Sequence, residues 1–317
     1  MSDNMRILLV GAGNMGKEYG KVLNALNISY SVVCRSEESA IKFNEEIGVM
    51  PIFGGLKNYL NGNNEIPDAA ILAVNVEFLS STVIELINWG VKEILVEKPA
   101  GLNRDEISEV YEASERADAN VYVAYNRRFY ASTQKALEII EEDGGVSSFN
   151  FEFTEWAFQI EKTSHAPEVK EEWLLANSTH VIDLAFFLGG YPKEMCSFNS
   201  GSLDWHSRAS KYAGAGISDK GIPFSYQANW DAPGRWAVEI LTDEHRLYFR
   251  PMEKLAIQNK GSVVVEDVEI DDQLDIDFKP GLYKQVEAFL YDKNDDKLLT
   301  IGEQLCHMSF YEKIDGK

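Results

Sequence analysis

The segment MRILLVGAGNMG, residues 5–16, joins a run of apolar residues to a glycine-rich turn. The unbroken apolar run is typical of a buried parallel strand, and a helical pattern over residues 14–27 begins inside the turn. In this setting GAGNMG matches the GxGxxG pattern of a dinucleotide-binding turn. Gly11 permits the tight turn, Gly13 lets the backbone approach a pyrophosphate, and Gly16 allows close packing of helix and strand. A plain glycine turn without a ligand is the alternative.

Short apolar runs alternate with helical patterns through residue 125. The pattern predicts strands at 5–10, 29–34, 69–74, 93–96 and 121–124, and helices at 14–27, 37–47, 78–89 and 104–117. Uninterrupted apolar strands separated by helices indicate a parallel sheet covered on both faces. We therefore expect a doubly wound α/β domain of the Rossmann type over residues 1–125.

The pattern changes after a helix expected at 132–142, at Asp143-Gly144-Gly145. Apolar and polar residues then alternate at 148–158, 226–230, 237–241 and 263–268, and helices are expected at 179–188, 280–291 and 302–311. Alternation predicts an antiparallel sheet with one face covered. We expect an α+β domain with an open, mainly antiparallel sheet over residues 126–317, whose C-terminal helices can pack back on the first domain.

Composition narrows the class of protein. The chain has 317 residues, 45% of them hydrophobic, and 30 basic against 51 acidic residues give a net charge of −21. Such an excess of negative charge argues against a nucleic-acid or anionic-membrane partner. Cys34, Cys196 and Cys306 form no CxxC pair, so neither a disulfide framework nor a metal site is expected. Without a long apolar run or a signal-peptide layout at the start, a cytoplasmic location is expected.

The second predicted strand ends in Cys34-Arg35-Ser36, where an NAD-preferring turn presents an acid to the ribose. An arginine and a hydroxyl stand there instead, which favours the 2′-phosphate of NADP(H). Two alternatives stay open. Ser36 can simply cap the next helix, and Glu37 or Glu38 can reach a ribose.

Val96-Glu97-Lys98-Pro99 lies at the carboxyl end of the strand predicted at 93–96. In an open α/β sheet this edge binds ligands. A lysine held there beside a proline can polarise a substrate oxygen or transfer a proton. An ordinary exposed surface lysine is the alternative for Lys98.

The chain resembles a known family at several points in order. GAGNMG at 11–16, EKPAG at 97–101, YNRRF at 125–129, HVID at 180–183 and GLYKQVEAF at 281–289 are similar to segments of the glucose–fructose oxidoreductase, inositol dehydrogenase and MocA (Gfo/Idh/MocA) family of NAD(P)-dependent oxidoreductases. The resemblance covers nearly the whole chain. It implies a dinucleotide-binding Rossmann domain and a second domain that binds substrate and forms oligomer contacts through its open sheet.

The resemblance gives Lys98 and His180 catalytic roles, His180 as proton donor or acceptor and Lys98 at the substrate oxygen. The family usually has an aspartate four residues before this histidine, where this chain has Ala176 and, next to it, Asn177. Asn177 can hydrogen-bond a ligand but accepts no proton at neutral pH. For His180 a core histidine is the alternative, and for Asp183 a salt bridge on the helix surface is the alternative to a substrate contact.

The predicted dinucleotide contacts are Gly11, Gly13, Asn14, Met15, Gly16, Arg35, Ser36, Asn75, Glu97 and Lys98. The predicted substrate contacts are Asn126, Arg127, Asn177 and Asp183. The expected reaction is hydride transfer between nicotinamide and a carbinol or carbonyl carbon of a sugar, nucleotide sugar or cyclic polyol, with NADP(H) preferred over NAD(H). Redox-assisted glycoside hydrolysis and a non-catalytic dinucleotide sensor are the alternatives. A homo-oligomer, dimer or tetramer, is expected.

Overall fold

The computed structural model describes residues 5–62 and 65–317, and the chain divides into two compact units. Unit 1 contains the chain up to Tyr125 together with Leu282–Cys306. Unit 2 contains Asn126–Gly281 together with His307–Lys317. Helix α12 (Ile301–Asp315) contributes residues to both units. No helix among the described residues is long and apolar enough to cross a membrane.

Unit 1 is built on a six-stranded sheet with the order β14-β5-β4-β3-β1-β2. Its strands are β1 (Ile7–Val10), β2 (Tyr30–Val33), β3 (Ala69–Leu72), β4 (Glu93–Glu97), β5 (Asn120–Ala124) and β14 (Leu299–Thr300). All neighbours pair in parallel except the edge strand β14, which is antiparallel to β5. Strands β1 and β3 are buried along their whole length, as strands covered on both faces must be. The predicted doubly wound Rossmann fold is confirmed.

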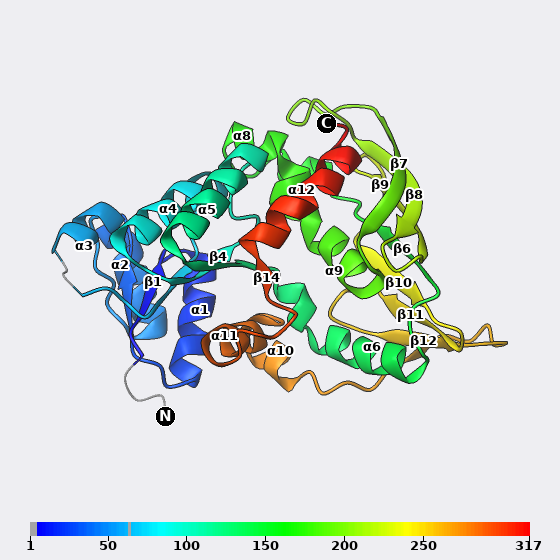
Figure 1. Ribbon diagram of the computed structural model, residues 1–317, viewed down its shortest axis with the longest axis horizontal. Coiled ribbons are helices and arrows are strands. Elements are labelled where there is room, and N and C mark those ends of the chain that lie inside the picture. Colours follow the sequence, from blue (N-terminus) through cyan, green and yellow to red (C-terminus); the bar gives the residue numbers. More distant parts are fainter. Residues whose placement is uncertain (1–4, 63–64) are drawn as a thin grey trace. The chain divides into compact units, whose positions relative to one another are not determined.

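Helices cover both faces of this sheet (Figure 1). They are α1 (Asn14–Ala25), α2 (Glu37–Ile47), α3 (Leu56–Gly62), α4 (Leu79–Trp89), α5 (Arg104–Ala117) and α11 (Leu282–Tyr291), with a short 3₁₀ turn η1 (Val76–Phe78). Helix α1 packs against α2 and α11, and α4 packs against α5. Helix α2 begins and ends where local signals predict. Ser36 caps α2 by accepting a hydrogen bond from the Ser39 amide at 3.3 Å, and Gly48 ends it with φ 82°.

Unit 2 is built on an eight-stranded sheet with the order β13-β12-β11-β10-β6-β9-β8-β7. Its strands are β6 (Ser148–Glu152), β7 (Pro192–Ser200), β8 (Lys211–Ser218), β9 (Pro223–Asn229), β10 (Ala237–Leu241), β11 (His245–Phe249), β12 (Ala256–Asn259) and β13 (Glu266–Asp267). Every pair is antiparallel except β6 with β9. The predicted open, mainly antiparallel sheet is confirmed.

One face of this sheet packs on α9 (Thr179–Gly189) through aromatic contacts. The ring of Phe186 lies 6.0 Å from that of Phe149 and 5.3 Å from that of Phe151, both edge-on. The remaining helical elements of unit 2 are η2 (Asn126–Phe129), α6 (Ala131–Glu142), α7 (Ala157–Ile160), α8 (Pro167–Glu171), the π-helix η3 (Leu174–Ser178) and α10 (Gln273–Asp277). On the opposite face side chains such as Phe198, 71% exposed, have no covering layer within the described chain.

Some predicted strands of unit 2 are wrong. The strand expected at 148–158 ends at Glu152, because the chain turns into α7 after Trp156. Of the strand expected at 263–268 only Glu266–Asp267 pairs, while Val263–Val265 are exposed. Sequence reasoning also missed β7, β8, β11 and β12. Strands β7 and β8 are rich in glycine, alanine, serine and charged residues, so they lack the apolar alternation that marks a strand with one buried face.

Candidate functional site

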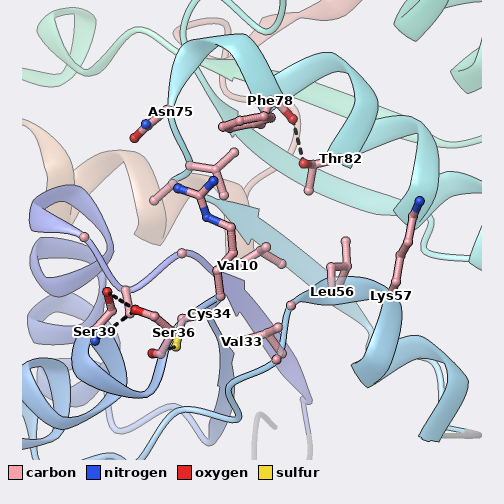
Figure 2. Close-up of a pocket in the computed structure, with 18 of the residues that line it drawn as sticks. Val10, Val33, Cys34, Ser36, Ser39, Leu56, Lys57, Asn75, Phe78 and Thr82 are labelled. Atoms are coloured by element: carbon pink, nitrogen blue, oxygen red, sulfur yellow. Dashed lines mark hydrogen bonds between the residues drawn. The ribbon is translucent and has the colours of Figure 1, made fainter. Parts of the chain in front are cut away.

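A pocket of about 660 Å³ opens in unit 1 where β1, β2 and β3 end. The last residues of β1 and β2 and the segments that follow the three strands line it, 10–13 at β1, 33–36 at β2 and 73–75 after β3 (Figure 2). The chain reverses its direction of strand addition between β1 and β3, so the pocket lies at the topological switch point. In open α/β sheets this is where dinucleotides bind.

The three glycines of the turn have the geometry that a dinucleotide turn requires. Gly11 has φ 114°, and a Cβ atom there would lie 2.3 Å from the carbonyl oxygen of Ala73. At Gly16 a Cβ atom would lie 2.1 Å from the carbonyl oxygen of Gly11, so helix and turn can touch only because residue 16 has no side chain. Gly13 differs, because a Cβ there would meet nothing within 4 Å. The open space beside Gly13, at an N-terminus of α1 without a side-chain cap, fits a pyrophosphate.

Cationic and hydroxyl groups line the pocket beyond the end of β2. The guanidinium of Arg35 lies over the Phe78 ring, 5.0 Å from its centroid. Ser36 and Ser39 line the same wall and are joined by a 2.9 Å hydrogen bond between their hydroxyls (Figure 2). Lys57 also lines the pocket, carried there by a turn at Gly54-Gly55 whose φ angles are 106° and 87°.

The acidic residues near this wall are placed elsewhere. Glu38 pairs with Lys42 one turn along α2 at 2.6 Å, and neither Glu37 nor Glu38 lines the pocket. The alternative that Ser36 caps the next helix is confirmed, because Ser36 caps α2. Ser36 also lines the pocket. Arg35 and Lys57 are the cations of the pocket lining, and one acidic residue, Glu85 of α4, also lines the pocket.

Of the ten predicted dinucleotide contacts, five line the pocket, namely Gly11, Gly13, Arg35, Ser36 and Asn75. Asn75 donates to Glu77 Oε1 at 3.2 Å. The other five, Asn14, Met15, Gly16, Glu97 and Lys98, lie outside its lining. A dinucleotide contact stays a prediction for all ten residues.

Glu97 and Lys98 lie at the carboxyl end of β4. The Glu97 carboxylate accepts a 2.8 Å hydrogen bond from the Tyr19 hydroxyl. Burial, and then the charge of Glu97, raise the pKa of Tyr19. Lys98 is only 8% exposed and precedes a cis peptide bond to Pro99. A buried position at the ligand-binding edge of the sheet differs from that of an ordinary surface lysine.

In unit 2 the residues around His180 form one polar cluster. His180 is in the first turn of α9, directly after the π-helix η3, and π-turns occur frequently at functional sites. Within η3, Asn177 Nδ2 and Ser178 Oγ both donate to the same oxygen of Glu155, each at 2.8 Å. The other carboxylate oxygen of Glu155 lies 3.3 Å from Arg235. Glu155 is 2% exposed and is a member of the cluster that sequence reasoning missed.

An aromatic side chain joins this cluster to the arginines. The ring of Trp236 lies 6.1 Å from the His180 ring. Arg127 and Arg235 both place their guanidinium groups against Trp236, at 4.8 and 4.6 Å from the ring centroid. Of the predicted substrate contacts, Arg127 and Asn177 are thus brought together with His180 around Trp236 and Glu155.

The two other predicted substrate contacts lie in different surroundings. Asn126 is 5% exposed and donates to the carbonyl oxygen of Pro280 at 2.9 Å. Asp183 is 1% exposed and is held by Arg128 at 2.6 Å, so the ion pair is buried and not on the helix surface. Substrate contact by either residue stays a prediction.

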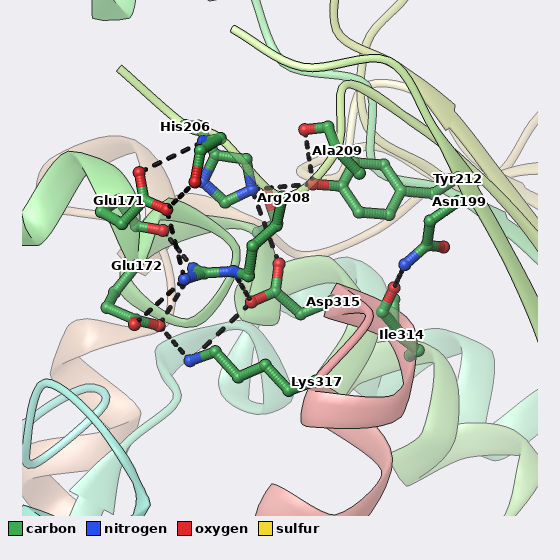
Figure 3. Close-up of polar contacts among 12 residues, drawn as sticks. Glu171, Glu172, Asn199, His206, Arg208, Ala209, Tyr212, Ile314, Asp315 and Lys317 are labelled. Carbon is green, nitrogen blue, oxygen red and sulfur yellow. Dashed lines mark hydrogen bonds and ion pairs between the residues drawn. The ribbon is translucent and has the colours of Figure 1, made fainter. Parts of the chain in front are cut away.

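A further polar network ties the C-terminal end of α12 to the loop at 204–210 (Figure 3). Arg208 pairs with Asp315 at 2.7 Å and with Glu172 at 3.2 Å, and Lys317 reaches Glu172 at 2.5 Å. His206 is fully buried, and its Nε2 lies 3.0 Å from the Tyr212 hydroxyl. These contacts stabilise unit 2, and no group of three or more His, Cys, Asp or Glu among residues 5–62 and 65–317 could hold a metal ion.

Comparison with known proteins gives the family of the first domain. Residues 5–125 match the family described as an oxidoreductase family with an NAD-binding Rossmann fold, Gfo/Idh/MocA. This domain belongs to the Gfo/Idh/MocA family. The match spans the glycine turn, the pocket and Lys98.

Individual proteins and structures are also similar to this chain. Myo-inositol 2-dehydrogenase from Thermotoga maritima is 28% identical over 142 residues, which are 43% of this chain and 41% of that protein, so the match spans less than half of the relative's length. A structure described as a putative NADPH-dependent oxidoreductase from Desulfitobacterium hafniense has a TM-score of 0.81, 15% identity, and coverage of 99% and 95%. Levoglucosan dehydrogenase in complex with NADH and levoglucosan has a TM-score of 0.78, 16% identity, and coverage of 98% and 96%. Both structures share the fold over nearly the full length.

Lys57 and Glu155 are site residues that sequence reasoning missed. Lys57 follows Gly54-Gly55, a pair that signals a turn but not its direction. Glu155 lies at the end of an alternating segment, where an acid is usually exposed, and only the packing of η3 against it makes it a buried acceptor.

Proposed function

We propose that the protein is an NAD(P)-dependent oxidoreductase that transfers hydride between nicotinamide and a carbinol or carbonyl carbon of a sugar, nucleotide sugar or cyclic polyol. The observation that carries the proposal is the pocket at the switch point of unit 1, with open space beside Gly13 at the start of α1. The nicotinamide cofactor supplies hydride donation or acceptance when it is bound. The protein supplies orientation and electrostatics.

We propose that NADP(H) is preferred over NAD(H). Arg35 provides a cation, and Ser36 and Ser39 provide two hydroxyls, on the wall where an adenine ribose would carry its 2′-phosphate, and Lys57 adds a second cation to the lining of the same pocket. Guanidinium groups bind phosphate in bidentate geometry, and ammonium groups bind it as point charges. Glu38 is held by Lys42, and both Glu37 and Glu38 lie outside the pocket lining, so the acids that directly follow Arg35 do not face a ribose there.

Lys98 and His180 are the proposed catalytic residues. His180 exchanges the proton of the reacting hydroxyl, because an imidazole with a pKa near 6.5 works in both directions near neutral pH. Lys98 stabilises negative charge on that oxygen. The two residues belong to different units, so each role is tested by its own substitution.

A sugar or polyol as substrate is supported by the activities of similar proteins. One is a myo-inositol 2-dehydrogenase and another is a levoglucosan dehydrogenase bound to levoglucosan. These activities belong to those proteins, and for this chain they indicate which compounds to test first. Asn177, beside the position where the family usually has an aspartate, hydrogen-bonds Glu155 and is proposed to contact substrate.

The first experiment is titration of purified protein with NADPH and with NADH, followed by fluorescence. We expect NADPH to bind at least tenfold more tightly, a difference of about 1.4 kcal/mol. Tighter binding of NADH would overturn the NADP preference, and binding of neither to nucleotide-free protein would overturn the proposed function. Lys98→Ala should then abolish turnover of any substrate found, while Lys42→Ala on the outer side of α2 should not.

Two alternative functions can be distinguished with the same purified protein and the same Lys98→Ala variant. Redox-assisted glycoside hydrolysis predicts a nucleotide that is released only on denaturation and shows no net change in oxidation state. A dinucleotide sensor predicts normal binding and no turnover, with Lys98→Ala leaving binding unchanged. The buried placement of Lys98 at the edge of the sheet favours catalysis over sensing.

We also propose that the chain forms a homo-oligomer, dimer or tetramer, through the uncovered face of the unit 2 sheet. Phe198, Ala213 and Ala215 on β7 and β8 are exposed there, and Ile217 is 40% exposed. An apolar face on a sheet is typical of an interface. Light scattering on wild type and Phe198→Lys tests this, and a monomeric wild type would refute it.

A further inference from the structure

One arginine of unit 2 has no acidic partner within the part of the chain that the structure describes. Unit 2 has six arginines, and five form ion pairs, with Asp183, Asp315, Glu155, Glu239 and Glu152. Arg127 forms no ion pair among residues 5–62 and 65–317, and its Nε atom is buried with no hydrogen-bond partner there. In a chain with a net charge of −21, a partly buried guanidinium without a carboxylate is an exception that requires an explanation.

The neighbours of Arg127 hold it in place without neutralising it. Its guanidinium lies 4.8 Å from the Trp236 ring centroid and 5.7 Å from that of Tyr130. Glu155 and Glu253 act on it only through the electrostatic field, beyond ion-pair distance, and Arg235 repels it. Burial, the largest influence, lowers the pKa of Arg127. The side chain is thus oriented by aromatic faces and keeps its donors available.

Trp236 provides a second donor of the same kind. Its indole Nε1 is buried with no hydrogen-bond partner in the described chain, although the residue is only 6% exposed. A buried indole N–H normally has an acceptor. Two adjacent donors that both lack an acceptor, one of them cationic, match a ligand that brings negatively charged oxygens.

We propose that Arg127 and Trp236 bind an anionic oxygen group of the substrate, a carboxylate or a phosphate, beside His180. The inference rests on the proposed function and narrows its substrate class to acidic or phosphorylated sugars. Glu155 does not oppose such a ligand, because Arg235 pairs with its charge and Asn177 and Ser178 donate to it. The His180 ring, 6.1 Å from Trp236, lies close to where the anion would anchor the substrate.

The first test measures binding without turnover. Inorganic phosphate and acetate are titrated into wild type, Arg127→Gln and Arg250→Gln at constant ionic strength, with melting temperature and tryptophan fluorescence as readouts. Arg250 is an exposed arginine of the same unit, so its variant is matched in charge. We expect at least one anion to stabilise wild type and Arg250→Gln, and to bind Arg127→Gln at least tenfold more weakly. Equal responses in all three proteins would overturn the proposal.

The second test compares D-glucose, D-glucuronate and D-glucose 6-phosphate as ligands in the presence of NADPH. We expect one of the two charged sugars to bind more tightly than glucose to wild type, which also identifies the anion as carboxylate or phosphate. That preference should disappear in Arg127→Gln, while NADPH affinity stays within twofold because the dinucleotide pocket is in unit 1. A preference for glucose would overturn the inference and leave the proposed function intact. If wild-type protein does not bind NADPH, the proposed function is overturned.

Discussion

The Asp183 carboxylate accepts two hydrogen bonds from the Arg128 guanidinium, from Nε at 2.8 Å and from Nη2 at 2.6 Å. Neither side chain is more than 2% exposed. The Tyr191 hydroxyl lies 3.1 Å from the same Nη2. This bidentate pair joins η2 to α9, the helix that carries His180. When one charge of such a pair is removed, the other stays buried without compensation.

Replacement of Asp183 by asparagine should therefore destabilise the protein by about 3–5 kcal/mol. Urea unfolding measures the change, and Asp271→Asn, at an exposed position, is the control. A role in substrate contact predicts a different result. In that case Asp183→Asn would unfold like wild type and raise KM for the substrate.

The glycine turn allows a matched pair of substitutions. Gly13→Ala adds a methyl group into open space, so we expect normal unfolding and at least tenfold weaker NADPH binding. Gly16→Ala forces a methyl group against the Gly11 carbonyl and should lower stability as well as binding. Thermal melts and NADPH titration separate the two effects. Wild-type affinity in a folded Gly13→Ala protein would show that the dinucleotide does not approach this turn.

Arg35 and Lys57 should carry the discrimination between the two cofactors. Arg35→Ala and Lys57→Ala should each weaken NADPH binding about tenfold, or 1.4 kcal/mol, and change NADH binding less than twofold. The physical reason is that only NADPH carries the additional phosphate. Titration of both nucleotides checks this, with Lys42→Ala as the control. Equal weakening of NADPH and NADH would assign these residues to the shared part of the cofactor.

Glu155 should act by positioning η3 ahead of His180. Glu155→Ala leaves the donors of Asn177 and Ser178 without their buried acceptor and should cost about 2 kcal/mol. Glu155→Gln keeps an acceptor oxygen and should recover most of this stability. If the carboxylate only supports the fold, the glutamine variant will also recover kcat. A shifted pH profile of kcat in folded Glu155→Gln would show that its charge acts on His180.

His307 should make the protein sensitive to acid. Burial, and then the nearby Arg128, lower the pKa of His307 to about 3 from 6.5. Because the unfolded chain binds the proton first, stability is full above pH 6.5 and falls as the pH drops from 6.5 toward 3. The loss at pH 5 is on the order of 2 kcal/mol, at 1.36 kcal/mol for each pKa unit.

The variant His307→Phe removes this titration and keeps an aromatic ring against Tyr191, whose ring centroid lies 4.3 Å from that of His307. Urea midpoints of wild type and variant at pH 7 and pH 5 provide the measurement. We expect the urea midpoint to differ less between pH 7 and pH 5 in the variant than in wild type. An unchanged difference would mean that other groups cause the acid sensitivity.

Features with local causes were predicted well. Helices α2 and α5 run over the residues expected, 37–47 and 104–117, because Ser36 and Asn103 cap their first turns. The dinucleotide turn followed from GAGNMG in the same way, since tight turns and close backbone contacts admit few residues other than glycine. Strands β7 and β8 could not be found by such reasoning, because pairing with each other and with β9 defines them and their composition does not.

Local sequence thus established the Rossmann fold, the glycine turn and the end of β2 with Arg35. Long-range packing brought together groups that no local pattern connects, namely Lys57 with Arg35 in the pocket, Glu155 with Asn177, and Arg127 with Trp236. The physical reason is the range of the forces. Backbone conformation and capping act over a few neighbouring residues, whereas a binding site depends on which side chains the folded sheets and helices place within a few ångströms of one another.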